Sequence, residues 1–184
     1  MRTFFTLAAF LTVGGLWAAP VPTSEDYQKK AEQAPWAWSD ERASVTYSAR
    51  QLGGGYKAEF RPCDTFGYGT VRVLKDGGVV HSFAGHTRTV FAVRDDILYY
   101  ADFGPITSGC AVVAYDLKAK KQLWKTHLRG LRDGRPHSVY RNAVLLDLDG
   151  QAVCVRGRES AGRYIEYVDL KTGKTVGHKV YPRK

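Results

Sequence analysis

The sequence predicts an all-β chain built from repeated antiparallel units, with one short helix near its N-terminus. The main observation is an internal duplication, because the segment 109–125 returns as 162–178 with Gly, Asp-Leu-Lys and a later Lys at one constant offset. Each copy has the pattern of strand, tight polar turn and strand, which is typical of repeat architectures. From Ser44 onward no apolar spacing of helical period extends beyond about two turns, so strands and turns are expected throughout.

Residues 1–19 are expected to be a signal peptide rather than part of the fold. Arg2 gives a positive start, an uncharged apolar stretch runs from Phe4 to Trp17, and Ala18 and Ala19 supply small residues for cleavage. The alternative is an uncleaved membrane anchor, but about 15 apolar residues fall short of the roughly 20 that span a bilayer. The sequence therefore predicts export to the periplasm or the extracellular space, without a transmembrane span.

Residues 20–42 are expected to form a linker with a short helix and an aromatic arm. Thr23 or Ser24 can cap a helix over 25–34, and Pro35 ends it because the residue before a proline avoids helical ψ angles.

The aromatic arm consists of Trp36 and Trp38 on either side of Ala37. Such alternation suits an extended segment that lays both rings on one surface. We favour the interpretation in which the rings plug the open end of the β core, and the alternative is a platform that stacks on a ligand.

Residues 43–184 are expected to be one β-repeat domain with units at about 44–84, 86–128 and 137–181. In the third unit Asp149-Gly150 separates two apolar runs, which predicts a type I′ hairpin turn because both central residues need positive φ. Asp95-Asp96 separates two apolar runs in the second unit. Each unit thus has four strands in about 45 residues, the size of one propeller blade.

The first unit follows the same pattern more faintly. Its expected strands are Val45–Tyr47, 56–60, 70–73 and 79–83, and Gly53–Gly55 is expected to be a flexible loop or a wide turn. Three units are too few for an ordinary closed propeller. We therefore predict stacked four-stranded antiparallel meanders in an incomplete, propeller-like arrangement, with a two-sheet β-sandwich as the alternative and with homo-oligomers through open sheet edges as one expected kind of partner.

The three cysteines, Cys63, Cys110 and Cys154, allow one intramolecular disulfide at most. Each lies in or beside an apolar strand, and their spacing matches no zinc motif. The favoured interpretation is that they are small core residues, and a disulfide is the alternative.

The net charge of +9 favours acidic partners, such as an anionic polysaccharide or another polyanion. The chain contains no DNA-specific motif. Arginines and tyrosines alternate in the third unit, and arginine forks beside aromatic faces suit phosphate, carboxylate or sugar recognition. The candidate ligand-binding residues are Tyr140, Arg141, Arg156, Arg158, Arg163 and Tyr164, with Tyr167 close by. Cross-strand Tyr–Arg pairing on a solvated sheet face is the alternative explanation.

Two loops are expected to lie on one face and to form the binding edge, namely 104–109 in the second unit and 157–162 in the third.

No catalytic, metal or cofactor residues are predicted. No two histidines have the spacing of a local metal site, and His86 and His137 hold equivalent repeat positions that suggest a structural role. Ser160 lacks the glycine-flanked elbow of a serine hydrolase. The acids Glu59, Glu159 and Glu166 could serve a glycosidase only if folding brought two of them within about 5–10 Å.

The segment 112–125, Val-Val-Ala-Tyr-Asp-Leu-Lys-Ala-Lys-Lys-Gln-Leu-Trp-Lys, resembles the quinoprotein-type β-propeller repeat. The resemblance implies that Trp124 packs between blades, and it implies a fold rather than a chemistry. Lys120 stands where that repeat usually has Gly, and Gly177 stands where the third unit would have Trp. The stretch from about Gly85 to Lys179 is also similar to uncharacterised exported proteins of the planctomycete type, a group that implies no known activity.

The expected function is that of an exported, non-enzymatic binding or scaffold protein for an acidic or carbohydrate ligand. One alternative is a hydrolase or oxidoreductase whose site assembles from distant loops, and another is a structural envelope protein that self-associates.

Overall fold

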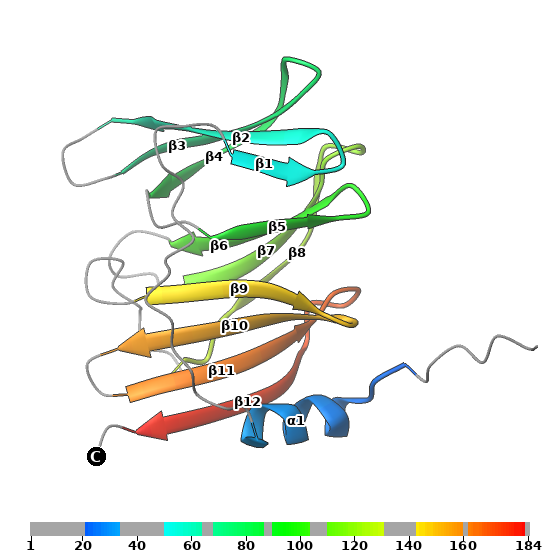
Figure 1. Cartoon of the computed structure of the whole chain (residues 1–184), viewed down its shortest axis with the longest axis vertical. Coiled ribbons are helices and arrows are strands. Elements are labelled where there is room, and N and C mark those ends of the chain that lie inside the picture. The colour runs from blue at the N-terminus through cyan, green and yellow to red at the C-terminus, as the bar shows by residue number, and fades with distance from the viewer. Residues whose placement is uncertain are drawn as a thin grey trace, which may run out of the picture.

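The computed structural model of the chain describes residues 21–33, 50–63, 68–86, 90–103, 110–130, 143–159 and 162–182. These residues form one helix, α1 (Ser24–Gln33), and three four-stranded antiparallel sheets (Figure 1). The expected leader 1–19, the tryptophans Trp36 and Trp38, and the expected strand Val45–Tyr47 lie outside the described residues.

Each sheet is a meander whose strands follow one another along the chain. The first sheet contains β1 (Arg50–Gly53), β2 (Tyr56–Pro62), β3 (Tyr68–Lys75) and β4 (Gly78–His86). The second contains β5 (Phe91–Arg94), β6 (Ile97–Phe103), β7 (Cys110–Asp116) and β8 (Lys121–His127). The third contains β9 (Ala143–Asp149), β10 (Ala152–Glu159), β11 (Gly162–Asp169) and β12 (Thr175–Pro182).

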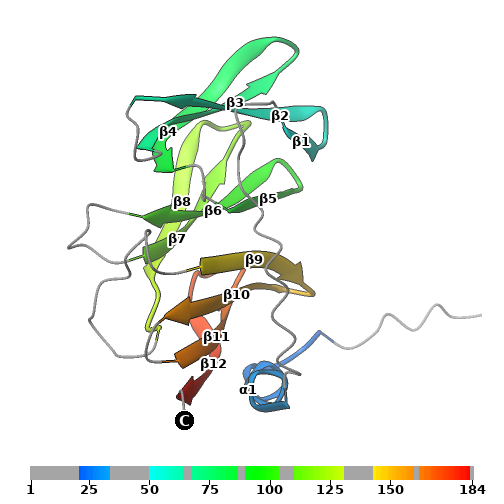
Figure 2. The ribbon, with the colours of Figure 1, turned by 60° about the vertical axis from the view of Figure 1, so that its left-hand side comes forward.

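The prediction of an all-β chain with stacked four-stranded meanders and a short N-terminal helix is confirmed. The two-sheet sandwich is wrong, because the strands divide into three sheets. The sheets are stacked in chain order, with α1 beyond the third sheet (Figures 1 and 2). The first strands of neighbouring sheets, β1, β5 and β9, contact one another in turn.

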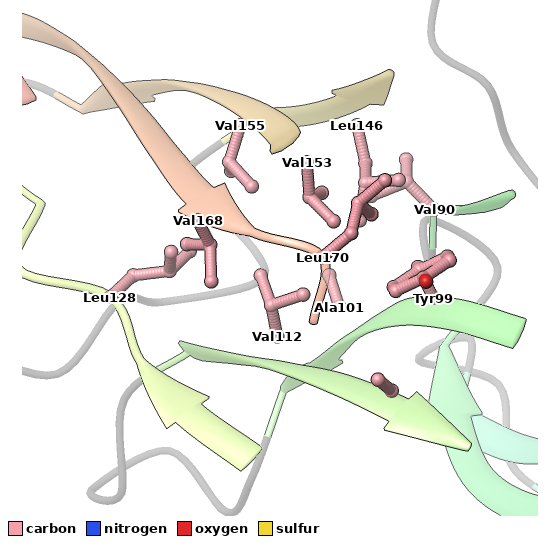
Figure 3. Close-up of a cluster of buried hydrophobic side chains, with 11 residues drawn as sticks. Val90, Tyr99, Ala101, Val112, Leu128, Leu146, Val153, Val155, Val168 and Leu170 are labelled. Atoms are coloured by element: carbon pink, nitrogen blue, oxygen red, sulfur yellow. The ribbon is translucent and has the colours of Figure 1, made fainter. Parts of the chain in front are cut away.

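Two apolar layers hold the stack together. One lies between the first and second sheets, where Val71 and Val73 belong to one cluster with Leu98 and Val113. The other lies between the second and third sheets and is shown in Figure 3, where Val112 of β7 points toward the side chains of the third sheet. Because both faces of the second sheet are buried, β7 is apolar at consecutive positions rather than alternating.

Helix α1 closes the far side of the third sheet. Its N-terminus is capped reciprocally, since the Thr23 backbone N–H donates to Asp26 Oδ2 and the Asp26 N–H donates to Thr23 Oγ1. Tyr27 and Ala31 are buried against the sheet. The Tyr27 hydroxyl donates to the Asp149 carbonyl at 3.0 Å, which fixes the helix to the β9–β10 turn.

Three hairpins close with two central residues of positive φ, as type I′ turns require. These pairs are Gly54-Gly55, Asp76-Gly77 and Asp95-Asp96. Gly53–Gly55 is therefore part of a tight hairpin, and the expectation of a flexible loop or wide turn is wrong.

The β9–β10 turn also differs from its prediction. Asp149 pairs with Ala152, so the central residues are Gly150 and Gln151, and of these two only Gly150 has a positive φ. This fits a type II′ turn shifted by one residue, rather than a type I′ turn at Asp149-Gly150.

The fourth strand of every sheet carries a β-bulge at the same place. In each sheet one residue of the fourth strand has no Cα partner on the third strand. These residues are Val80 in β4, Leu123 in β8 and Val176 in β12. We call the residue that directly follows the bulge the aligned position. It is His81 in β4, Trp124 in β8 and Gly177 in β12, and each lies against the following layer of the stack. The shared bulge thus shows which residues of the first unit correspond to which residues of the other two units.

At this aligned position the contacts differ from layer to layer. His81 stacks on Tyr115 of the second sheet, with ring centroids 3.6 Å apart. Trp124 Nε1–H donates to the Leu170 carbonyl of the third unit at 2.9 Å. At Gly177 an added Cβ would lie 2.6 Å from the Tyr27 carbonyl oxygen, so the backbone of α1 occupies the space that a side chain would need.

The duplicated Asp-Leu-Lys corners have matching geometry. Asp116 Oδ1 accepts hydrogen bonds from the Lys118 and Ala119 N–H groups, and Asp169 Oδ1 accepts them from Lys171 and Thr172. Gly173 has a φ of 70°, and Lys120 takes the equivalent place with a φ of 55°.

The turns that join first to second strands and third to fourth strands all lie at one end of the strands (Figure 1). In the described ranges no helix has the length and apolar character to cross a membrane.

Candidate functional site

The predicted ligand-binding residues fall into three groups. Arg156, Arg163 and Tyr164 are described with their side chains, Arg158 is described by its backbone, and Tyr140 and Arg141 lie outside the described residues. The binding edge predicted from the loops is described only in part, because 104–109 and 160–161 are outside the described residues.

Register places the arginines of the third sheet on one face. Arg158 of β10 is the Cα partner of Arg163 of β11. In the next row Arg156 is the partner of Ile165, and Ile165 is in turn the partner of Lys179 on β12. We call the set Arg156, Arg158, Arg163 and Lys179 the cationic patch.

The cationic patch lies on the face that also carries α1. Because α1 packs on β11 and β12, the patch residues of β10 lie toward the other side of this face. The Arg156 side chain is 35% exposed and forms an ion pair with Asp147 of β9, whose side chain is 57% exposed. Ion pairs this open to solvent contribute little to stability.

Tyr164 and Tyr167 are both buried and are not exposed beside the arginines. Tyr164 follows Arg163 in the strand and therefore points to the opposite face, where it is fully buried. Its ring covers Gly157, since a Cβ on that glycine would lie 2.0 Å from the ring. Tyr167 is buried against Tyr27 of α1, with ring centroids 5.3 Å apart. Burial raises the pKa of Tyr167.

A buried polar cluster that the sequence did not indicate lies on the inner face of the third sheet. Glu166 is fully buried, and its carboxylate accepts hydrogen bonds from the Arg129 N–H at 2.9 Å and from Thr175 Oγ1 at 2.8 Å. His178 is the cross-strand partner of Glu166, and its Nε2 atom lies 2.8 Å from the Gly130 carbonyl oxygen. Both side chains thus hold the backbone of Arg129 and Gly130.

Burial raises the pKa of the Glu166 carboxyl, while the Thr175 hydroxyl, His178 and the backbone N–H groups of Arg129 and Gly130 oppose that rise. Glu166 has no exposed surface, and each of its oxygens already accepts a hydrogen bond. The geometry is that of a carboxylate that fixes a chain segment. Glu59 lies in another sheet and pairs with Lys57, so this carboxylate and Glu166 do not form a glycosidase-like pair.

A second cluster missed by sequence reasoning lies between the first two sheets. His81 stacks on Tyr115, and its neighbour on the same face, Phe83, stacks on Tyr100 with centroids 3.9 Å apart. His81 Nε2 is buried without a hydrogen-bond partner among the described residues. Burial lowers the pKa of His81 and raises that of Tyr100 to about 12.

The cysteines differ from one another. Cys154 is buried under α1 with a free thiol, as expected of a core residue, and burial raises its pKa to about 11. Cys63 also carries a free thiol but is exposed at the end of β2, so the prediction that it is a core residue is wrong. The side chain of Cys110 is outside the described part. Among the described residues no three His, Cys, Asp or Glu side chains gather where a metal ion could bind.

Comparison with known proteins gives little. No family model matches the chain, and no curated protein matches it. A solved structure of the AtxE2 isopeptidase matches at 10% identity with a TM-score of 0.42, over 71% of this chain and 20% of that chain. The aligned part is a fifth of that protein, and a likeness of this size carries no argument about this chain.

Proposed function

We propose that this is an exported, non-catalytic binding protein whose cationic patch recognises an acidic ligand, with an anionic polysaccharide as the first candidate. The observation that carries the proposal is the direct opposition of Arg158 and Arg163 on neighbouring strands. Directly opposed positions on neighbouring strands share a face and lie about 4.5–5.5 Å apart, so one bound anion can contact both arginines. Arginine is also the side chain best suited to bind carboxylate, sulfate or phosphate groups in a bidentate manner.

The spacing of the patch supports a ligand with several charges. Residues two apart on one strand lie about 6.7 Å apart, and neighbouring strands lie about 4.8 Å apart. Arg156 and Arg158 are two apart on β10, with Arg163 and Lys179 on the next two strands. A polymer with an anionic group on every one or two units can contact several of these cations together, and the overall charge of +9 attracts it.

Retention on a heparin column with a salt gradient tests the proposal. The double variant Arg156→Ala/Arg163→Ala is expected to elute at clearly lower salt than the wild type, because two patch cations are lost. The matched control is Lys118→Ala/Lys121→Ala, which removes two exposed cations, one from the β7–β8 turn and one from the start of β8. The control is expected to elute close to the wild type.

Far-ultraviolet circular dichroism verifies that both variants stay folded. Equal shifts for the two double variants would mean that only the overall field attracts heparin, and the patch would lose its role. Binding of a neutral polysaccharide such as dextran, independent of salt, would show that sugar rings rather than charges are recognised. That outcome would also contradict the proposal.

A further inference from the structure

The edges of the three sheets are protected to different degrees. Exposed edge strands tend to pair with other chains, and proteins limit this with short strands, charges, prolines, bulges or covers. The first strands β1 and β5 have four residues each, and β9 carries Asp147 and Asp149. Among the fourth strands, β8 carries Lys121 and Lys125, whereas β12 carries Lys179 and ends at Pro182.

The strand β4 shares the bulge of the other fourth strands but has neither their charges nor their prolines, and it is not short. Its nine residues, Gly-Val-Val-His-Ser-Phe-Ala-Gly-His, include no lysine, arginine, aspartate, glutamate or proline. β4 is the last strand of its sheet, and its only hydrogen-bonded neighbour among the described strands is β3. Val79, at its start, is one of the exposed large hydrophobic residues of the described chain, at 43%.

The bulges show which backbone groups of β4 point outward. The residues that directly follow the aligned position are equivalent in the three fourth strands. They are Ser82 in β4, Lys125 in β8 and His178 in β12. In β12 the His178 N–H and C=O point away from the sheet, because both bond to the side-chain amide of Gln28, at 3.0 and 3.2 Å. By this equivalence the N–H and C=O of Ser82 also point away from the sheet, and Ser82 is exposed.

We propose that two copies of the chain associate through β4, paired antiparallel across a twofold axis at Ser82. The two first sheets then form one eight-stranded sheet. This interface goes beyond the proposed ligand binding and uses a different sheet.

Self-pairing of β4 is favoured over pairing with another partner by complementarity and by charge. Centring on Ser82 places His81 of one copy opposite Phe83 of the second copy, and the symmetry repeats this contact. Both rings are half-buried at the margin between the first two sheets, so a second copy would cover their remaining surface. Two chains of charge +9 repel one another, and an uncharged strand is where they can approach at least cost.

The first experiment measures mass against concentration by analytical ultracentrifugation. The wild type is expected to form dimers with increasing concentration. Ser82→Lys is expected to weaken dimerisation at least about tenfold, because two lysines then face each other across the axis. Thr70→Lys is the matched control, since Thr70 is exposed on the neighbouring strand β3 but not at the edge, and it should dimerise as the wild type does.

The second experiment tests the register by cross-linking. Hydrogen-bonded antiparallel partners have Cα atoms about 5.5 Å apart, within the range of about 4.4–6.8 Å that disulfides span. In a Cys63→Ser background, Ser82→Cys is therefore expected to give a covalent dimer after mild oxidation with diamide, whereas Thr70→Cys should not.

Three outcomes would overturn the inference. The first is a wild type that stays monomeric at all concentrations while Ser82→Cys fails to cross-link. The second is a dimer unaffected by Ser82→Lys, since it would use another surface. The third is capture of an extended peptide by β4 without self-association, which would identify a different occupant.

Discussion

Replacement of Trp124 by alanine tests whether this side chain joins the second sheet to the third. The indole N–H donates to the Leu170 carbonyl at 2.9 Å, and the ring lies so close to Gly173 that a Cβ there would be 2.7 Å from it. Truncating a fully buried tryptophan costs about 3–5 kcal/mol, so a half-buried one is expected to cost about 2 kcal/mol. The lost hydrogen bond adds about 1 kcal/mol. The expected loss in the free energy of unfolding is therefore about 3 kcal/mol.

Two further variants separate these contributions. Trp124→Phe keeps most of the ring contact but removes the donor, so a loss of about 1–1.5 kcal/mol is expected. Leu123→Ala alters the preceding residue, which is 41% exposed at the bulge, and should change stability by only about 0.5 kcal/mol. Urea denaturation followed by far-ultraviolet circular dichroism gives all three values.

The shape of the transition is also informative. In repeat proteins each unit contacts only its neighbours, so a loss at one interface can uncouple the units on either side. Trp124→Ala is expected to lower the m-value or to broaden the transition as the third sheet melts first. Stability within about 0.5 kcal/mol of the wild type, with an unchanged m-value, would refute the role of Trp124 between the sheets.

Three more predictions concern α1, one turn and one histidine. Gly177→Ala is expected to loosen α1, because the new Cβ would lie 2.6 Å from the Tyr27 carbonyl oxygen. Amide hydrogen exchange should accelerate in α1 but not in the second sheet, and unchanged α1 protection would contradict this. Lys120→Gly is expected to stabilise the protein by about 0.5–1 kcal/mol, because glycine adopts a φ of 55° without strain, and a lower Tm would contradict it. Since burial lowers the pKa of His81, the folded state binds fewer protons there, and stability should fall as pH drops below its ordinary value of 6.5. His81→Phe should reduce this dependence between pH 7.5 and 5, measured by urea denaturation at concentrations where the protein is monomeric, and an unaltered pH profile would exclude the effect.

The fold was predictable where local chemistry repeats. The Asp-Leu-Lys corners and the apolar runs between turns predicted four-stranded units, because turn type and strand period depend on nearby residues. The helix was predictable for the same reason, since Thr23 caps it through Asp26, three residues away. Gly53–Gly55 was not predictable, because glycines permit both a loose loop and the tight turn that forms.

The aligned position after the bulge could not be found by sequence similarity. His81, Trp124 and Gly177 share no chemistry, because each is matched to the layer that it faces: a tyrosine ring, a turn and a helix backbone.

The candidate site was predictable only in part. The arginines of β10 and β11 do share a face, as period-two alternation requires, but the same alternation sends Tyr164 to the core. The sequence did not predict that Glu166 is buried and fixes a chain segment. One of its partners is the backbone N–H of Arg129, and a backbone partner cannot be recognised from the type of residue.

The glycine at position 177 has a consequence for how such a chain can change in length. In a stack each layer contacts only its neighbours, so the number of layers depends on what covers the last one. Here the last sheet is covered by α1 rather than by another sheet, because Gly177 has no side chain and leaves room for the helix backbone. Insertion of further copies ahead of this last sheet would lengthen the molecule while the layers on either side keep their own contacts.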